Sequence, residues 1–228
     1  MKEMRIKVDE LQSICANNKI VGQGGFGIVY QLDDDMLFKF NYKDFIDCFE
    51  IKNNSFDFRS LMDISDEIES RKQIEKIVYK GAERQIVQTI RKAGKKQGNI
   101  SLTALTQGLV YCNDYCIGYL LKNHKNMVNL YDYLCERGLE NSEMTKVLEN
   151  ISNSVQELMQ CNIYHYDLTT RNILICPENN DIQIIDFEDQ IRVYDEPNSN
   201  SIKEVQRQLK DIEEFCAGQV IGLEDCGY

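Results

Sequence analysis

Three side chains with oxygen donors stand close together in the second half of the sequence. Asp167 lies in the run 165–168 (HYDL), Asn172 follows it by five residues, and Asp186 follows Asn172 by fourteen. Mg²⁺ prefers hard oxygen ligands and keeps several waters, so Asn172 and Asp186 suit a metal ion that is bridged to a triphosphate. Asp167 suits a base that accepts a hydroxyl proton. Chance supplies any one of these residues, but rarely all of them in this order.

A glycine pattern, Gly22-x-Gly24-x-x-Gly27-x-Val29, forms a second candidate site. Glycines at this spacing permit unusual backbone angles and let main-chain N–H groups approach phosphate oxygens. Strand-like residues (28–30, IVY) follow the pattern, whereas a dinucleotide-binding Rossmann turn would open a helix. The context predicts a strand-turn-strand flap over a nucleotide, with an ordinary glycine-rich hairpin as the alternative.

Lys39 lies in an apolar strand-like run, one strand after this flap. Its ammonium could reach the α- and β-phosphates if a carboxylate held it in place. Glu83 is the predicted partner because apolar residues on its helical face would turn it inward, and Glu75 is the second candidate. The alternatives are a solvent-facing strand lysine and a solvated helix charge.

The elements that must position these residues change in character along the chain. Residues 19–40 predict two strands around the glycine turn, then a third strand after the acidic turn 33–35. Residues 41–62 are expected to be irregular, and residues 63–91 show near-helical spacing of apolar positions. Residues 102–111 and 116–122 predict two more strands.

The second half of the chain predicts helices around a hairpin. Apolar residues from Met144 to Met159 recur at helical spacing, which predicts a long helix that starts near Asn141. The runs 172–176 (NILIC) and 181–186 (DIQIID) predict two short strands joined by a turn. A further helix is expected over roughly residues 201–215.

Length and composition limit the classes of protein that fit. The 228 residues have room for one large domain or two small lobes. A hydrophobic fraction of 43 %, a charged fraction of 28 % and only 2 prolines exclude a low-complexity, collagen-like or wholly disordered chain. The net charge of −11 opposes binding to nucleic acid or to anionic membranes.

The cysteines and the N-terminal residues indicate the cellular compartment in which the protein is expected to work. The 9 cysteines include no C-x-x-C pair, which predicts reduced thiols in a cytoplasmic protein without a structural metal. The charged run 1–13 lacks the apolar core of a secretory signal, and no run of about 18 apolar residues suits a membrane span. If the chain leaves its cell, it is expected to do so without a cleaved signal of this type.

The sequence resembles the protein kinase fold. The resemblance spans about residues 19–190 and rests on four motifs in the family's order: the glycine run 22–30 (GQGGFGIVY), Lys39, the run 165–172 (HYDLTTRN) and Asp186-Phe187. It implies an α+β, bilobal fold. Residues 1–121 would form an N-lobe with a five-stranded antiparallel sheet and an insertion at about 41–75. Residues 122–228 would form a truncated, mostly helical C-lobe without a full activation segment.

The resemblance also implies a cofactor, ATP with Mg²⁺, and a role for each matching residue. Asp167 would be the catalytic base, Asn172 and Asp186 would hold Mg²⁺, and Lys39 would pair with Glu83 and the phosphates. Residues that would bind ATP are Gly22, Gly24, Gly25, Gly27 and Val29 in the glycine run, and Leu121, Lys122 and His124 beside the adenine.

Several positions depart from the family's pattern. Glu188 replaces the glycine of the Asp-Phe-Gly motif, and Leu37 is bulkier than the usual alanine above the adenine. Thr169 replaces the lysine common in Ser/Thr kinases, although Arg171 lies where tyrosine kinases carry a basic residue that neutralises phosphate. No Ala-Pro-Glu motif follows Phe187, so the usual activation-loop phosphorylation switch is not expected.

A truncated C-lobe, the run 165–170 (HYDLTT) and a polar residue after Asp186-Phe187 resemble most the minimal effector kinases of the OspG and NleH type, which bacterial pathogens inject into host cells. That resemblance rests on about 40 residues. It implies action in the host cytoplasm and a host activating partner, such as a ubiquitin conjugate.

Three functions remain open. The first is an ATP–Mg²⁺-dependent Ser/Thr protein kinase with a protein substrate. The second is a small-molecule phosphotransferase of kinase-like fold, which the missing activation segment fits. The third is a pseudokinase or binding module, against which Lys39, Asp167, Asn172 and Asp186 argue because the residues for turnover are intact.

Overall fold

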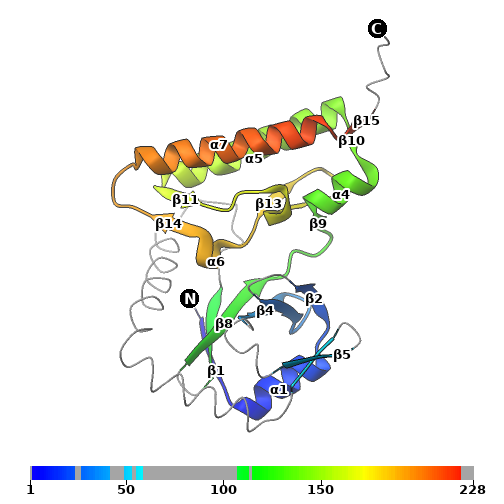
Figure 1. The fold of residues 1–228 in the computed structure, drawn as a ribbon, viewed down its shortest axis with the longest axis vertical. Coiled ribbons are helices and arrows are strands. Elements are labelled where there is room, and N and C mark those ends of the chain that lie inside the picture. Colours follow the sequence, from blue (N-terminus) through cyan, green and yellow to red (C-terminus); the bar gives the residue numbers. More distant parts are fainter. Residues whose placement is uncertain are drawn as a thin grey trace. The chain divides into compact units, whose positions relative to one another are not determined.

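The computed structural model of the chain describes residues 2–23, 27–41, 49–52, 55–58, 107–112 and 115–221 (Figure 1). These residues fall into two compact units, the first ending at Asn123 and the second beginning at His124. Gly24, Gly25, Glu83 and Glu75 lie outside the described residues, as do the helices expected within 63–91.

The first unit is built on a six-stranded sheet with the order β1-β7-β8-β4-β3-β2. Its strands are β1 (Lys2–Ile6), β2 (Ile20–Gln23), β3 (Ile28–Gln31), β4 (Met36–Phe40), β7 (Gly108–Cys112) and β8 (Tyr115–Lys122). All neighbours pair antiparallel except β1 and β7, which are parallel. The expected five antiparallel strands are therefore present, but the predicted strand count is wrong because β1 adds a parallel edge strand.

The strand β1 was missed because charged residues dominate its sequence. Glu3 and Arg5 are exposed, while Met4 is half-buried and Ile6 is buried, so the strand does alternate with the period of two that a half-buried strand requires. Met4 and Ile6 alone form too short an alternating pattern to predict a strand within a charged run.

Helix α1 (Val8–Asn17) was also not expected, and it covers one face of the sheet. Its Leu11 is fully buried in the same core as Phe38 and Phe40 of β4. Because side chains alternate along a strand, Lys39 lies on the opposite face from these two phenylalanines. The helix therefore packs on the sheet face that does not carry Lys39.

The turn at residues 33–35 forms as its sequence predicts. The Asp33 carboxylate accepts the backbone N–H groups of Asp35 and Met36, each at 2.8 Å. Such a side chain-to-backbone turn is the usual reason for aspartate at this place. The expectation of irregular structure over 41–62 is wrong in part, because β5 (Phe49–Lys52) and β6 (Ser55–Phe58) pair as an antiparallel hairpin.

In its described residues, 124–221, the second unit has three longer helices with short strands between them. The helices are α4 (Leu130–Arg137), α5 (Asn141–Gln160) and α7 (Ser199–Ala217), with the shorter η2 (Thr170–Asn172) and α6 (Phe187–Gln190). The strands are β9 (Val128–Asn129), β10 (Leu139–Glu140), β11 (Ile163–His165), β12 (Ile173–Ile175), β13 (Ile182–Ile184), β14 (Ile191–Val193) and β15 (Val220–Ile221).

Helices α5 and α7 run side by side and share one hydrophobic core (Figure 1). The predicted apolar stripe of α5 is confirmed, since Val147, Ile151 and Val155 are buried in this core. Val205 and Ile212 of α7 are buried in the same core. The hairpin of β12 and β13, which is also as predicted, packs against α5.

Among the described residues, no helix has the length and apolar character needed to cross a membrane. No disulfide joins any of the seven cysteines that the structure describes to another of them.

Candidate active site

The loop between β11 and β12 carries Asp167 and Asn172, and the β12–β13 hairpin brings Asp186 back to it. Ile173 pairs with Ile184, and one step further the Asn172 carbonyl accepts the Ile185 N–H at 2.9 Å. Asp186 is the next residue. The hairpin register therefore places Asn172 and Asp186 at the same end of the hairpin, as the sequence predicts.

Asn172 is bonded directly to the predicted base. Its Nδ2 donates to the Asp167 carbonyl at 2.8 Å and to the Asp167 carboxylate at 2.9 Å. Both bonds use the amide nitrogen, so Oδ1 of Asn172 is the atom that remains suited to a metal ion. The Asp186 carboxylate, at the same end of the hairpin, is also a hard oxygen donor of the kind that Mg²⁺ prefers.

Asp186 has an unusual backbone conformation for a residue other than glycine. Its φ of 66° and ψ of 49° lie in the left-handed region, which costs roughly 1–2 kcal/mol in most residues. Aspartate tolerates this region better than most side chains because it is short and polar. The turn leads directly into α6, whose Phe187 is buried and packs edge-on against His165 with ring centroids 5.0 Å apart.

His165 connects the backbone beside Asp186 to that of Asp167 through its neutral ring. Its Nε2 lies 3.0 Å from the Ile185 carbonyl, which can only accept, so Nε2 carries the proton. Its Nδ1 then accepts the Asp167 N–H at 3.2 Å. Burial lowers the pKa of His165, and the Ile185 carbonyl with the Asp186 and Asp167 carboxylates opposes that effect without reversing it. The neutral ring is the form that both bonds require.

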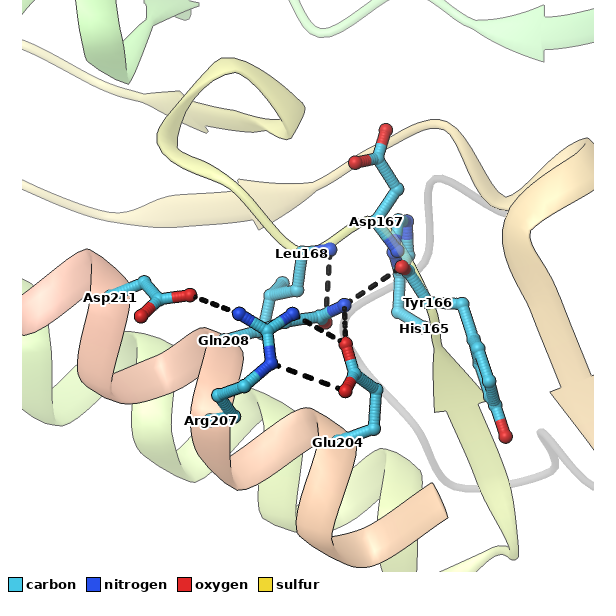
Figure 2. Close-up of polar contacts among 8 residues, drawn as sticks. All are labelled: His165, Tyr166, Asp167, Leu168, Glu204, Arg207, Gln208 and Asp211. Carbon is cyan, nitrogen blue, oxygen red and sulfur yellow. Dashed lines mark hydrogen bonds and ion pairs between the residues drawn. The ribbon is translucent and has the colours of Figure 1, made fainter. Parts of the chain in front are cut away.

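Gln208 of α7 holds the backbone on both sides of Asp167 (Figure 2). Its Oε1 accepts the Leu168 N–H at 3.1 Å, and its Nε2 donates to the Tyr166 carbonyl at 2.7 Å. Figure 2 shows the Asp167 side chain pointing away from α7. Gln208 was not predicted, although one signal was available: it is a polar residue at a buried position of α7, between Val205 and Ile212.

A chain of charged residues on α7 continues from Gln208 (Figure 2). Glu204 accepts from Gln208 at 3.1 Å and from Arg207 at 2.6 and 3.2 Å. Arg207 also bonds Asp211 at 2.6 Å. The hydrogen bond from Arg207 lowers the pKa of Glu204, and the same bond raises the pKa of Arg207.

Arg171, the predicted phosphate-neutralising residue, lies against α4. Its guanidinium carbon is 4.3 Å from the centroid of the Tyr131 ring, which stacks in turn on Phe215 of α7. Asn129 joins the same elements, because its Oδ1 caps α4 and its Nδ2 donates to the Arg171 carbonyl at 2.6 Å. Neither Tyr131 nor Asn129 was predicted, since contacts between α4 and the loop leave no periodic pattern.

The first unit carries all of the predicted nucleotide-binding residues except His124. Lys39 is only 9 % exposed and lies opposite Val29 of β3 on one side and Tyr119 of β8 on the other. Directly opposed residues share a face of the sheet, so these three side chains form one row. Fully buried lysines are rare, which sets Lys39 apart from an ordinary solvent-facing lysine.

The predicted flap has strands on both sides, as its sequence context indicates. Gly22 of β2 pairs with Val29 of β3, and Gly27 immediately precedes β3. A Cβ on Gly27 would lie 2.7 Å from the Phe40 carbonyl oxygen and 3.5 Å from the Lys39 Cγ, so only glycine fits there. Leu121 and Lys122 end β8 in the first unit, whereas His124 begins the second unit.

Comparison with known proteins identifies the family of the chain. The family model described as protein tyrosine and serine/threonine kinase matches residues 64–210, which is more than half of the chain. The match includes Asp167, Asn172 and Asp186 and begins after the glycine run and Lys39. No curated protein matches the chain. The loop geometry and the family match agree, and the chain belongs to the family of protein tyrosine and serine/threonine kinases.

Proposed function

We propose that this protein kinase transfers the γ-phosphoryl group of ATP, with Mg²⁺, to serine or threonine hydroxyls of a protein substrate. The observation that supports the proposal most is the bonding of Asn172 to Asp167 beside Asp186, at one end of the β12–β13 hairpin. Family membership supports the reaction class but covers tyrosine as well as Ser/Thr kinases. The choice of Ser/Thr therefore belongs to the proposal.

In the proposed reaction, the acceptor oxygen forms a bond to the γ-phosphorus while the bond from that phosphorus to the β–γ bridging oxygen breaks. ADP leaves, and the hydroxyl proton passes to the Asp167 carboxylate. Asp167 is exposed, so a substrate hydroxyl can approach it. Its carboxylate is held by the Asn172 amide, which limits the positions from which it can accept a proton.

Asn172 and Asp186 would hold Mg²⁺ through Oδ1 and the carboxylate. The ion, when bound with ATP, would supply charge neutralisation on the phosphates. Lys39 would add a further positive charge, paired with Glu83, and the glycine run would bring backbone N–H groups to the phosphates. Gly24, Gly25 and Glu83 enter this proposal from the sequence alone, because they lie outside the described residues.

We also propose that the kinase works without an activation-loop switch. The segment 187–198 between Asp186 and α7 is short, and its β14 pairs with β11. The Tyr166 N–H donates to the Gln190 carbonyl at 2.7 Å, and the Asn198 N–H donates to the Tyr164 hydroxyl at 3.2 Å. A segment fixed in this way has little freedom to change position on phosphorylation, which supports a catalytic loop that is ordered without it.

A role as a secreted bacterial effector in host cytoplasm, with a host activating partner of the ubiquitin-conjugate type, extends the proposal. It is supported by the run 165–170 (HYDLTT) and by Glu188 after Asp186-Phe187. Purified protein is expected to turn ATP over slowly alone and faster with host extract or a ubiquitin-charged conjugating enzyme. Full turnover without any addition would contradict the partner requirement.

The central experiment follows labelled γ-phosphate from ATP in the wild type, Lys39→Ala and Asp167→Ala. Acceptors are generic proteins, an aminoglycoside and choline, and phosphoamino acids are separated after hydrolysis of labelled protein. Phosphoserine or phosphothreonine that disappears in both variants supports the proposal, and phosphotyrosine alone would overturn the Ser/Thr choice. Label only on a small molecule would indicate the phosphotransferase, and no label with nucleotide binding retained would indicate a pseudokinase.

A further inference from the structure

We propose that Gln208 is a positioning residue that sets the location of Asp167 for phosphoryl transfer, and that it does so through the polarity of its carboxamide. The proposal rests on the function proposed for Asp167. It goes further because it assigns control of the catalytic loop to one side chain of α7, forty residues further along the chain.

The two bonds of Gln208 bracket the proposed base. Oε1 accepts the N–H of Leu168, and Nε2 donates to the carbonyl of Tyr166, so the residues before and after Asp167 are bound by one planar group. His165 binds the Asp167 N–H itself at 3.2 Å. Three successive residues of the loop therefore have fixed backbone groups, and the Asp167 carboxylate extends from the other side (Figure 2).

Only one orientation of the Gln208 amide satisfies these partners. The second N–H of Nε2 points to Glu204 Oε1 at 3.1 Å, and Glu204 is held by Arg207. A flipped amide would place its oxygen against the Tyr166 carbonyl and the Glu204 carboxylate, both of which can only accept. Because Gln208 is 6 % exposed, water cannot readily replace a lost partner.

A substitution that removes the polar atoms tests the positioning. Gln208→Leu keeps much of the volume but neither bond, and we expect kcat to fall about 10–100-fold with little change in the KM for ATP. Gln206→Leu is the matched control, because Gln206 lies on the same helix but is exposed. Its kcat is expected to equal that of the wild type.

A second variant gives a signature that loss of packing cannot produce. In Gln208→Glu, a protonated carboxyl can still accept from Leu168 and donate to Tyr166, whereas an ionised one faces the Tyr166 carbonyl and the Glu204 carboxylate. Burial and a neighbouring carboxylate both favour the protonated form. We therefore expect the ratio of its kcat to that of the wild type to rise as the pH falls from about 8 to about 6.

The other titratable groups near this position are present in both enzymes, so the ratio isolates the new carboxyl. They are Glu204, Arg207 and Asp211 on α7, and His165, Tyr166 and Asp167 on the loop and β11. Gln206→Glu is the control for the ratio, which is expected to stay constant with pH.

Amide hydrogen exchange separates this inference from the proposed function, because it requires no activity. Exchange at the Leu168 N–H is expected to be at least tenfold faster in Gln208→Leu than in the wild type, and unchanged in Gln206→Leu. Unchanged exchange, or a pH-independent ratio for Gln208→Glu, would overturn the positioning role even if the kinase is active. If exchange is faster in Gln208→Leu but the wild type labels no acceptor, Gln208 still holds the backbone of the loop but has no role in catalysis. That result would also overturn the proposal as stated.

Discussion

The side-chain amide of Asn172 donates to both the carbonyl and the carboxylate of Asp167, at 2.8 and 2.9 Å. Both of these bonds use the amide nitrogen of Asn172, so the two ends of the amide can serve different purposes. The nitrogen orients the proposed base, and the oxygen is the atom suited to Mg²⁺. One side chain can thus link the position of the base to the position of the metal ion.

This double use predicts how Asn172 variants behave. Asn172→Ala removes both ends and is expected to lower kcat by about 10²-fold or more. Asn172→Asp keeps an oxygen for the metal but replaces the donor with a second carboxylate beside Asp167, so kcat should also fall while the Mg²⁺ requirement persists. Steady-state assays with varied Mg²⁺ measure both effects. Asn150→Ala, which removes a hydrogen bond to the Asn180 carbonyl instead, is expected to leave kcat unchanged.

Lys39 provides a test on the first unit. Lys39→Met retains the aliphatic stem but removes the charge, so the fold should persist while kcat/KM for ATP falls by about 10²-fold or more. Lys39→Arg is also expected to lose activity, since a planar guanidinium does not replace a compact ammonium in a buried position. The exposed Lys19→Met is the control. Wild-type activity in Lys39→Met would remove Lys39 from the proposed site.

Two glycines next to β4 are predicted to be intolerant of any side chain. A Cβ on Gly27 would lie 2.7 Å from the Phe40 carbonyl, and a Cβ on Gly118 would overlap the Lys39 carbonyl. Gly27→Ala and Gly118→Ala are each expected to lower the free energy of unfolding by about 1–3 kcal/mol. Thermal denaturation should show a fall in Tm of roughly 2–4 °C for each kcal/mol.

Gly22→Ala is the matched control for these two variants. A Cβ on Gly22 would lie 3.7 Å from the Cβ of Val29, which is an ordinary van der Waals distance. The Tm of Gly22→Ala should stay close to that of the wild type. Equal Tm values in all three variants would contradict the close approach described for Gly27 and Gly118.

The neutral state of His165 predicts a dependence of stability on pH. Its pKa is lowered in the folded protein, so the unfolded chain binds more protons and stability rises with pH. The contribution of neutral His165 to the free energy of unfolding is complete above the ordinary pKa of 6.5. It is lost as the pH falls from 6.5 through the lowered pKa of the folded state. Denaturant unfolding at several pH values measures this loss.

His165→Gln removes the titrating ring, so the difference in unfolding free energy between wild type and this variant should shrink as the medium becomes more acidic. His124→Gln, at the only other histidine, controls for the general effect of acid. A difference that stays constant with pH would show that His165 is not held neutral by the fold.

Much of the fold could be predicted because the signals are local. The apolar residues of α5 recur at helical spacing, and that stripe is buried in the structure. The strands of the β12–β13 hairpin have apolar runs on both sides of a turn. Strand β1 and helix α1 could not be predicted in the same way, since β1 is stabilised by pairing with β7, which is distant in sequence.

The residues of the candidate site also fall into those that the local sequence predicts and those that it does not. Asp167, Asn172 and Asp186 could be identified because their residue types and order suit one reaction, and the hairpin register brings the last two together. Gln208 and Tyr131 could not, because they act through contacts with a loop that is distant in sequence. A glutamine bonded to backbone groups leaves no mark in the sequence except its place among apolar neighbours.

The parallel pairing of β1 with β7 has a consequence for the order of events during biosynthesis. Residues Lys2–Ile6 leave the ribosome about a hundred residues before their hydrogen-bonding partners, Gly108–Cys112. The edge of β1 must therefore remain without its native neighbour while the intervening chain is translated, and closing so long a loop slows completion of the sheet. Nascent chains that end before residue 108 are expected to expose this strand to chaperones or to self-association.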